Sequence, residues 1–266
     1  RGETLGVQED FVNAEIAMIL HDQLLAAGAD SRGARNLSKT AGNGESGYPR
    51  WQEGALYHAK TLGAPSWVWN STAVTSDADV RTRPLFANWL GAAAVVSVHN
   101  NASAATRPGE GTGTEIWIDT SNAQRSASER LARAIQQRLI GRLRTYYDRN
   151  WPDRGLQPCN GCLGENRLAT RPSVLIELAF MDRALPDNAA IKSALFRQQA
   201  ALGIREGLED FFRVAGPVPT PTPPPTPTPT PPQPVSLWID GRTASTRPQG
   251  QAFGLAASGL TSYSAV

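Results

Sequence analysis

The sequence predicts an α/β fold, in which a mixed and mostly parallel β-sheet is flanked by helices. Short apolar runs alternate along the chain with longer segments of helical periodicity, which is the pattern of α/β domains. The run at 92–98 is almost unbroken in its small and β-branched residues, as expected of a buried strand with helices on both faces of its sheet. The 266 residues are 40% hydrophobic, which suffices for one sizeable core.

Each element follows from a local pattern. Helices are predicted where apolar residues recur at intervals of three and four, and Gly28 ends the first of them. The predicted helices span 9–27, 51–62, 83–90, 126–147 and 189–212. The predicted strands span 92–98, 114–118 and 173–178, and the segments 29–49 and 150–171 are expected to be irregular.

A stretch of proline and threonine, residues 216–234, divides the chain. This composition cannot bury a core, so it predicts an extended polyproline II linker between a main domain at 1–215 and whatever follows. Residues 235–266 open with VSLWIDGRTAS, a strand-and-turn pattern, and are expected to be the beginning of an incomplete β-rich module. The chain starts at Arg1 rather than Met and stops in mid-pattern, so we expect a segment of a longer protein.

The net charge and the apolar runs of the chain limit the kinds of binding partner to expect. The formal net charge is +2, which gives no electrostatic reason to expect binding to nucleic acid. No apolar run is long enough to span a bilayer, so we expect no membrane span. We also expect a monomer.

The two cysteines lie in the short motif CNGC. A structural zinc site normally needs four protein ligands, which one pair cannot supply. The flanking segments do not resemble a thioredoxin motif. We therefore favour a structural disulfide between Cys159 and Cys162 over a functional dithiol.

Three polar residues fit poorly in a purely structural interior. His99 directly follows the apolar run, at the carboxyl end of a strand, where sites in α/β sheets are built. Glu177 interrupts the apolar strand SVLIELAF; burial there would raise its pKa and suit a general acid/base, although a structural partner for an arginine is the alternative. Glu9 lies in the first turn of the first helix, where a carboxylate also stabilises the helix dipole. Together they suit Zn²⁺ with an open position for water.

Four motifs appear in the order and spacing of the zinc-dependent N-acetylmuramoyl-L-alanine amidases of type 3, and the chain resembles that family over residues 1–213. The motifs are EDFVNAEIA from Glu9, RPLFANWLGAAAVVSVHNNA from Arg83, GTGTEIWI from Gly111 and RPSVLIELAFMD from Arg171. The resemblance implies a phosphorylase/hydrolase-like fold and hydrolysis of the amide between N-acetylmuramic acid and L-alanine in peptidoglycan. It also implies a bacterial protein that is secreted or held in the cell envelope.

The resemblance assigns roles to particular residues. It implies that Glu9 and His99 are zinc ligands and that Glu177 is the catalytic acid/base. Asn166 and Arg167, in the loop before the Glu177 strand, are expected to contact substrate. That loop also carries the two cysteines and is expected to form one wall of the cleft.

One feature departs from the family pattern. The family's first zinc ligand is a histidine in a Pro-Gly-His segment on a strand before the first helix, whereas only RGETLGVQ precedes Glu9 here. Neither His21 nor His58 matches that motif, so we expect the missing strand and ligand to lie upstream. Arg83 and Asn88 match the family's "R…AN" positions and are expected to support the site structurally.

Two alternative functions remain open from the sequence. Another zinc peptidase, such as a carboxypeptidase-like enzyme, would also use a histidine and two glutamates. A non-catalytic module for cell-wall binding or adhesion could retain a vestigial site. A serine or cysteine hydrolase is disfavoured because the chain has no Gly-x-Ser-x-Gly motif and no histidine partner for its cysteines.

Overall fold

A computed structural model describes residues 3–69, 76–215, 238–239 and 242–243. The chain divides into two compact units, Arg1–Pro224 and Pro225–Val266, and each is described by itself. The first unit contains a four-stranded sheet with the strand order β1-β4-β2-β3. The pairs β1–β4 and β2–β3 are parallel, and β2–β4 is antiparallel, so the predicted mixed, mostly parallel sheet is confirmed.

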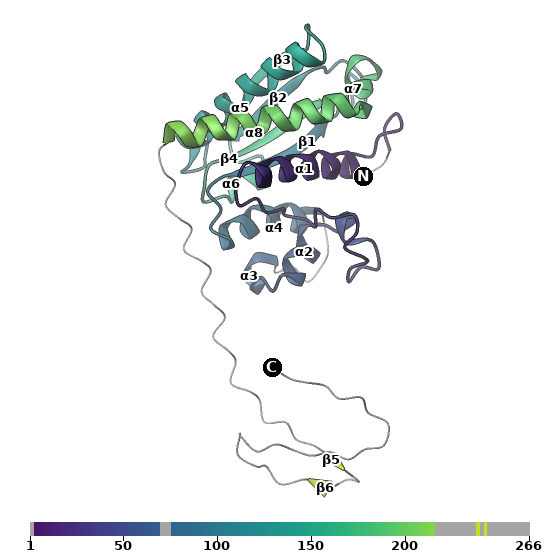
Figure 1. Cartoon of the computed structure of the whole chain (residues 1–266), viewed down its shortest axis with the longest axis vertical. Coiled ribbons are helices and arrows are strands. Elements are labelled where there is room, and N and C mark those ends of the chain that lie inside the picture. The colour runs from purple at the N-terminus through teal and green to yellow at the C-terminus, as the bar shows by residue number, and fades with distance from the viewer. Residues whose placement is uncertain (1–2, 70–75, 216–237, 240–241, 244–266) are drawn as a thin grey trace. The chain divides into compact units, whose positions relative to one another are not determined.

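Helices flank this sheet (Figure 1). The strands are β1 (Val95–Asn101), β2 (Thr114–Asp119), β3 (Asp153–Cys159) and β4 (Ser173–Phe180). The helices are α1 (Glu9–Ala26), α2 (Ala55–Thr61), α3 (Ser66–Trp69), α4 (Ser76–Trp89), α5 (Arg125–Tyr146), α6 (Gly164–Arg167), α7 (Ala189–Lys192) and α8 (Ala194–Ala215), with short turns η1 (Arg50–Gln52) and η2 (Ala184–Asn188). No helix in the described ranges is long and apolar enough to cross a membrane.

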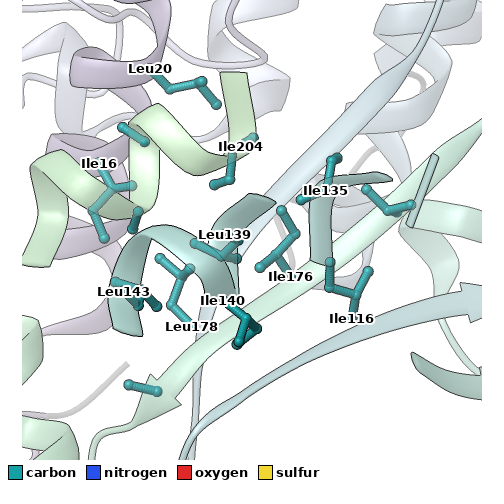
Figure 2. Packing of buried hydrophobic residues seen from close by; sticks show 14 of the residues in the cluster. Ile16, Leu20, Ile116, Ile135, Leu139, Ile140, Leu143, Ile176, Leu178 and Ile204 are labelled. Atoms are coloured by element: carbon teal, nitrogen blue, oxygen red, sulfur yellow. The ribbon is translucent and has the colours of Figure 1, made fainter. Parts of the chain in front are cut away.

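The main core lies between one face of the sheet and the long helices α5 and α8 (Figure 2). Successive residues of a strand point to opposite faces, and Ile176 and Leu178 of β4 join Ile116 of β2 on the core side. The α5 residues Ile135 and Leu139 pack against them and are fully buried. Burying each such side chain contributes about 1.5–3 kcal/mol to stability.

The motif GTGTEIWI fixes the start of β2. Gly113 has φ +91°, and a Cβ there would lie 2.4 Å from the carbonyl oxygen of Pro152, so only glycine fits. Its amide donates to Oδ2 of buried Asp187 (2.7 Å), which also accepts from the Phe180 amide (3.0 Å). Asp187 thereby ties the start of β2 to the end of β4.

Strand β3 is an element that the sequence analysis missed, because residues 150–171 were expected to be irregular. Its sequence DRGLQPC lacks alternating hydrophobicity and contains Gly155 and Pro158. Both residues are tolerated because β3 is an edge strand of the sheet, where one side of the backbone needs no partner.

Other element boundaries also differ from prediction. Helix α4 begins at Ser76 and not at residue 83, so Pro84 lies inside the helix although proline favours the first turn. The single helix expected at 189–212 is two helices, because Ser193 adopts extended backbone angles (φ −76°, ψ 124°). Strand β1 starts at Val95, runs through Asn101 and is mostly half-buried, not fully buried, because it is an edge strand.

Little of the second unit is described. A two-residue strand pair, β5 (Trp238–Ile239) and β6 (Arg242–Thr243), is antiparallel, with Trp238 opposite Thr243. The predicted linker at 216–234 and most of the predicted module at 235–266 lie outside the described residues.

Candidate active site

Three functional side chains form a row across the face of the sheet opposite α5 and α8. His99 of β1 pairs in register with Glu177 of β4, and Glu177 pairs in register with Glu115 of β2. Residues that pair directly point to the same face, and their neighbours in the core point to the other. The sheet therefore brings together His99 and Glu177, which the sequence predicted, and adds Glu115.

The first turn of α1 brings Glu9 to the same place. Its Oε1 atom lies 3.1 Å from Nδ1 of His99, and the Glu9 side chain is 2% exposed. Asn13, one turn along α1, donates to Glu9 Oε1 (3.2 Å) and accepts from the side chain of Asn100 on β1 (2.8 Å). This pair of amides holds the start of α1 against β1 and fixes the Glu9 carboxylate beside His99.

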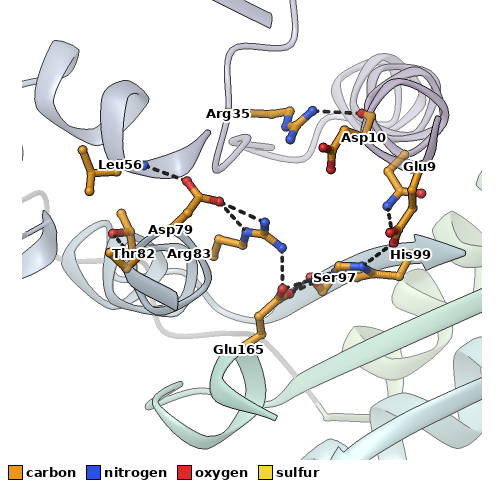
Figure 3. Close-up of polar contacts among 12 residues, drawn as sticks. Glu9, Asp10, Arg35, Leu56, Asp79, Thr82, Arg83, Ser97, His99 and Glu165 are labelled. Carbon is orange, nitrogen blue, oxygen red and sulfur yellow. Dashed lines mark hydrogen bonds and ion pairs between the residues drawn. The ribbon is translucent and has the colours of Figure 1, made fainter. Parts of the chain in front are cut away.

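A second carboxylate, Glu165 of α6, meets His99 from the other side (Figure 3). Its Oε1 lies 3.2 Å from His99 Nε2, and it is 6% exposed. Glu165 also accepts hydrogen bonds from the Ser97 hydroxyl and the Arg83 guanidinium. The sequence analysis missed Glu165, since α6 is a single turn and its contact partners lie far away in the sequence.

The two carboxylates change the protonation of the site. Burial disfavours the imidazolium form, but hydrogen bonds to Glu165 and Glu9 outweigh it and raise the pKa of His99 to about 9. Burial also opposes ionisation of Glu165, but the hydrogen bond from His99 and the charge of Arg83 lower its pKa to about 2. Without a metal, the site therefore holds a protonated histidine beside the ionised carboxylate of Glu165.

Glu177 is half-buried, whereas the carboxylates of Glu9, Glu115 and Glu165 are buried. It is the one residue of β4 that is not buried. The sequence analysis expected a buried carboxylate here, and one of its two oxygens, Oε2, is buried, although the side chain lies on the sheet face that the α5–α8 layer does not cover. A half-buried carboxylate next to His99 can exchange protons with a water molecule or a substrate group.

Glu115, at the other end of the row, is buried and fully hydrogen-bonded. It accepts from Asn101 Nδ2 (2.8 Å) and Trp117 Nε1 (3.0 Å) through Oε1, and from Arg154 Nε (2.6 Å) through Oε2. These donors satisfy its charge and hold β1, β2 and β3 together beside Glu177.

This architecture agrees with comparisons to known proteins. A model of the family described as N-acetylmuramoyl-L-alanine amidase (Amidase_3) matches residues 1–210. The chain belongs to the N-acetylmuramoyl-L-alanine amidase family. That membership favours an amidase over the zinc peptidase and the non-catalytic module that the sequence left open.

Solved structures share the fold of this family member. The N-acetylmuramyl-L-alanine amidase Ami1 from Mycobacterium smegmatis has a TM-score of 0.55 and 22% identity, over 79% of this chain and 80% of that one. An N-acetylmuramoyl-L-alanine amidase from Clostridium difficile 630 has a TM-score of 0.54 and 20% identity, over 81% and 91%. A search of curated protein sequences finds no significant match.

Within this amidase family domain, Arg83 and Asn88 of α4 hold the segment that precedes β4. Arg83 bonds both Glu165 and Asp79, and Asn88 donates to the Leu168 carbonyl (2.9 Å). Asn88 also accepts from the Thr170 amide (2.9 Å). These contacts support the structure around the site, which is the role that the sequence analysis expected for Arg83 and Asn88.

The structure separates the two residues predicted to contact substrate. Asn166 is 1% exposed, and its side chain donates to the Trp117 carbonyl (3.0 Å) and accepts from the Ser173 hydroxyl (3.2 Å). Its amide is thus committed to the interior, and we do not propose it as a substrate contact. Arg167 is exposed and donates to the Gly161 carbonyl (3.2 Å), so a role in substrate binding stays a prediction.

The two cysteines lie at the end of β3 and in the loop that connects β3 to α6. Cys159 and Cys162 are joined by a disulfide, with their Cα atoms 5.8 Å apart. The Gly161 amide in this loop donates to Asp119 Oδ1 at the end of β2 (3.3 Å). The loop is therefore anchored to the carboxyl end of β2.

The residues present offer part of a metal site. Two ligand atoms on one tetrahedral zinc are roughly 3.3 Å apart at the usual bond lengths, and Glu9 Oε1 and His99 Nδ1 are separated by 3.1 Å. These two donors therefore fit one metal ion. In the part of the chain that the structure describes, no group of three or more His, Cys, Asp or Glu side chains is arranged to hold a metal.

Proposed function

We propose that this family member is a zinc-dependent hydrolase that cleaves the amide bond between N-acetylmuramic acid and L-alanine in peptidoglycan. The observation that carries the proposal is the placement of Glu177. It is the half-buried residue of an otherwise buried strand, it pairs in register with His99, and His99 lies 3.1 Å from Glu9. A general acid/base thus stands beside a pair of metal donors.

Glu9 and His99 would supply two of the ligands to Zn²⁺ through Oε1 and Nδ1. When bound, the ion supplies Lewis-acid polarisation of the scissile carbonyl and of the attacking water. Because His99 must give up a proton to bind a metal, and its pKa is about 9 here, metal binding would release a proton at neutral pH.

Glu177 would move the protons of the reaction. Its carboxylate takes one proton from water as the water oxygen attacks the carbonyl carbon of the lactyl group. It then gives this proton to the nitrogen of L-alanine as the carbon–nitrogen bond breaks. The products are the lactyl carboxylate of the glycan and a stem peptide with a free amino terminus.

The substrate would be met outside the cytoplasmic membrane. Peptidoglycan is the proposed partner, and the protein is proposed to be a secreted or envelope-bound monomer. The domains are proposed as an amidase domain at 1–215, a linker at 216–234 and a β-rich module from 235. A polyproline linker would let that module anchor to the wall while the catalytic domain reaches its substrate.

The test is product analysis with the full-length protein. Purified peptidoglycan is incubated with the protein and Zn²⁺, and new amino termini are identified by mass spectrometry. We expect new L-alanine amino termini with wild type and none with Glu177→Gln. The matched control is Glu110→Gln, since Glu110 is 65% exposed in a loop and should keep full activity.

Two results would contradict the proposal. Release of free terminal amino acids, with the L-alanine linkage intact, would indicate a carboxypeptidase. Binding to the wall without any new amino terminus would indicate a non-catalytic module.

A further inference from the structure

Glu165 is a buried carboxylate that the proposed reaction does not use. It lies on α6, and it is the meeting point of three elements: Arg83 comes from α4, and Ser97 and His99 come from β1. Its side chain is 6% exposed, so placing a charge there is costly unless donors compensate it. Figure 3 shows Glu165 between the Arg83 guanidinium and the His99 ring.

The two nitrogens of His99 have different partners. Nδ1 lies 3.1 Å from Glu9, and Nε2 lies 3.2 Å from Glu165. The lone-pair directions of the two ring nitrogens diverge, so one metal ion cannot contact both sides of the ring. A metal shared by Glu9 and His99 must bind Nδ1, and it leaves Nε2 to carry the proton.

Glu165 is held so that it can accept that proton. The Arg83 guanidinium and the Ser97 hydroxyl both donate to it, and Arg83 is itself fixed by Asp79 (2.9 Å). The carboxylate is therefore held in a fixed orientation as an acceptor beside Nε2. Carboxylates that accept from a metal-ligating histidine fix its tautomer and ring orientation and make it a stronger donor.

We propose that Glu165 is a positioning residue that selects the Nε2–H tautomer of His99 and so directs Nδ1 to a metal shared with Glu9. This inference rests on the proposed zinc site. Arg83 and Ser97 act through Glu165, by holding its carboxylate in place.

The test uses the full-length protein with ¹⁵N-labelled histidine, loaded with ¹¹³Cd²⁺ as a zinc substitute. We expect ¹¹³Cd–¹⁵N coupling at Nδ1 of His99 and a proton on Nε2. Zinc affinity is measured in parallel by competition with a chromophoric chelator. The double variant Arg83→Gln/Glu165→Gln removes both members of the Arg83–Glu165 ion pair, so neither charge is left without the other. In this variant the Kd for zinc should rise about 10–100-fold.

A matched control separates this effect from a loss of structure. Glu53 is also a buried carboxylate (4% exposed), and it accepts from the Ser46 amide (2.9 Å) and hydroxyl (2.6 Å) away from His99. Glu53→Gln should leave zinc Kd and the His99 signals unchanged. Glu165→Asp should restore part of the affinity that Glu165→Gln loses.

Three outcomes would overturn the inference, and they differ in meaning. Coupling of cadmium to Nε2, or an unchanged zinc Kd in the Glu165 variants with Nε2–H retained, would refute the role of Glu165 and leave the zinc site standing. Absence of metal binding by the wild-type protein would refute the zinc site and this inference together.

Discussion

The two faces of the central sheet differ in the residues they present: one is apolar and buried, and the other is polar and holds the candidate site. On one face, Ile116 and Ile176 pack into the α5–α8 layer and are fully buried. On the other face, the neighbouring positions Glu115 and Glu177 form a row with His99. A change of one position along a strand thus separates a residue that stabilises the fold from one that is proposed to do chemistry.

This difference shows what each face requires of the sequence. The core face needs only apolar side chains of suitable volume, so many substitutions would preserve it. The site face needs charged groups at fixed separations, and each group needs its own hydrogen-bond donors. The donors that surround Glu115 and Glu165 illustrate this requirement. The following predictions test this separation between the two faces.

The largest effect is expected at Glu177 on the site face. Glu177→Gln should lower kcat on peptidoglycan by about 100- to 10,000-fold, since it removes a general acid/base. The free energy of unfolding should change little, because glutamine has nearly the same shape as glutamate and Glu177 is only half-buried. Turbidity clearance and urea denaturation measure the two quantities, and a large loss of stability would contradict the assignment.

The neighbouring core residue should behave in the opposite way. Ile176→Ala should lower the free energy of unfolding by about 2–5 kcal/mol, because Ile176 is fully buried and the change leaves a cavity. Its kcat, measured at a temperature where the variant is folded, should match wild type. A loss of kcat comparable to that of Glu177→Gln would show that the two faces are not separable.

A smaller effect is expected at Asn166. Asn166→Ala should cost about 1–3 kcal/mol of stability, because the Trp117 carbonyl and the Ser173 hydroxyl lose their partner. KM for peptidoglycan should not change. The adjacent exposed residue provides the comparison: Arg167→Ala should leave stability unchanged and raise KM. If KM increased in Asn166→Ala and not in Arg167→Ala, Asn166 would be a substrate contact after all.

The remaining prediction is a pH dependence of the metal-free protein. The pKa of His99 is about 9 when folded and 6.5 ordinarily, so its protonation stabilises the fold fully below pH 6.5 and this stabilisation is lost as pH rises through 9. In EDTA, the free energy of unfolding should fall by up to about 3 kcal/mol between pH 6.5 and 9. His99→Gln should remove this slope, and a slope that persists would assign it to other groups.

The sequence predicts the apolar face better than the polar one. Helical periodicity located α1 and α5 to within one residue at each end, because each buries a continuous apolar stripe. The β3 strand was missed, because an edge strand with Gly155 and Pro158 carries no hydrophobic alternation. Hydrophobic patterns in the sequence therefore predict buried elements well and edge strands poorly.

The candidate site was predictable only where a motif marked it. Glu9, His99 and Glu177 stand in recognisable motifs, and the structure brings all three to one place. Glu165 was missed because its partner Arg83 lies 82 residues away and α6 is one short turn. Asn166, next in the chain, was misassigned for the same reason, since sequence alone does not tell which way a short turn faces.

The most direct test of the account is the location of the metal. A crystal structure of the full-length protein with Zn²⁺, with anomalous data collected at the zinc edge, would locate it. The account predicts one peak on the polar face of the sheet, about 2.0–2.1 Å from both Glu9 Oε1 and His99 Nδ1 and beside Glu177. A peak elsewhere, or a zinc bound through His99 Nε2 to Glu165, would contradict it.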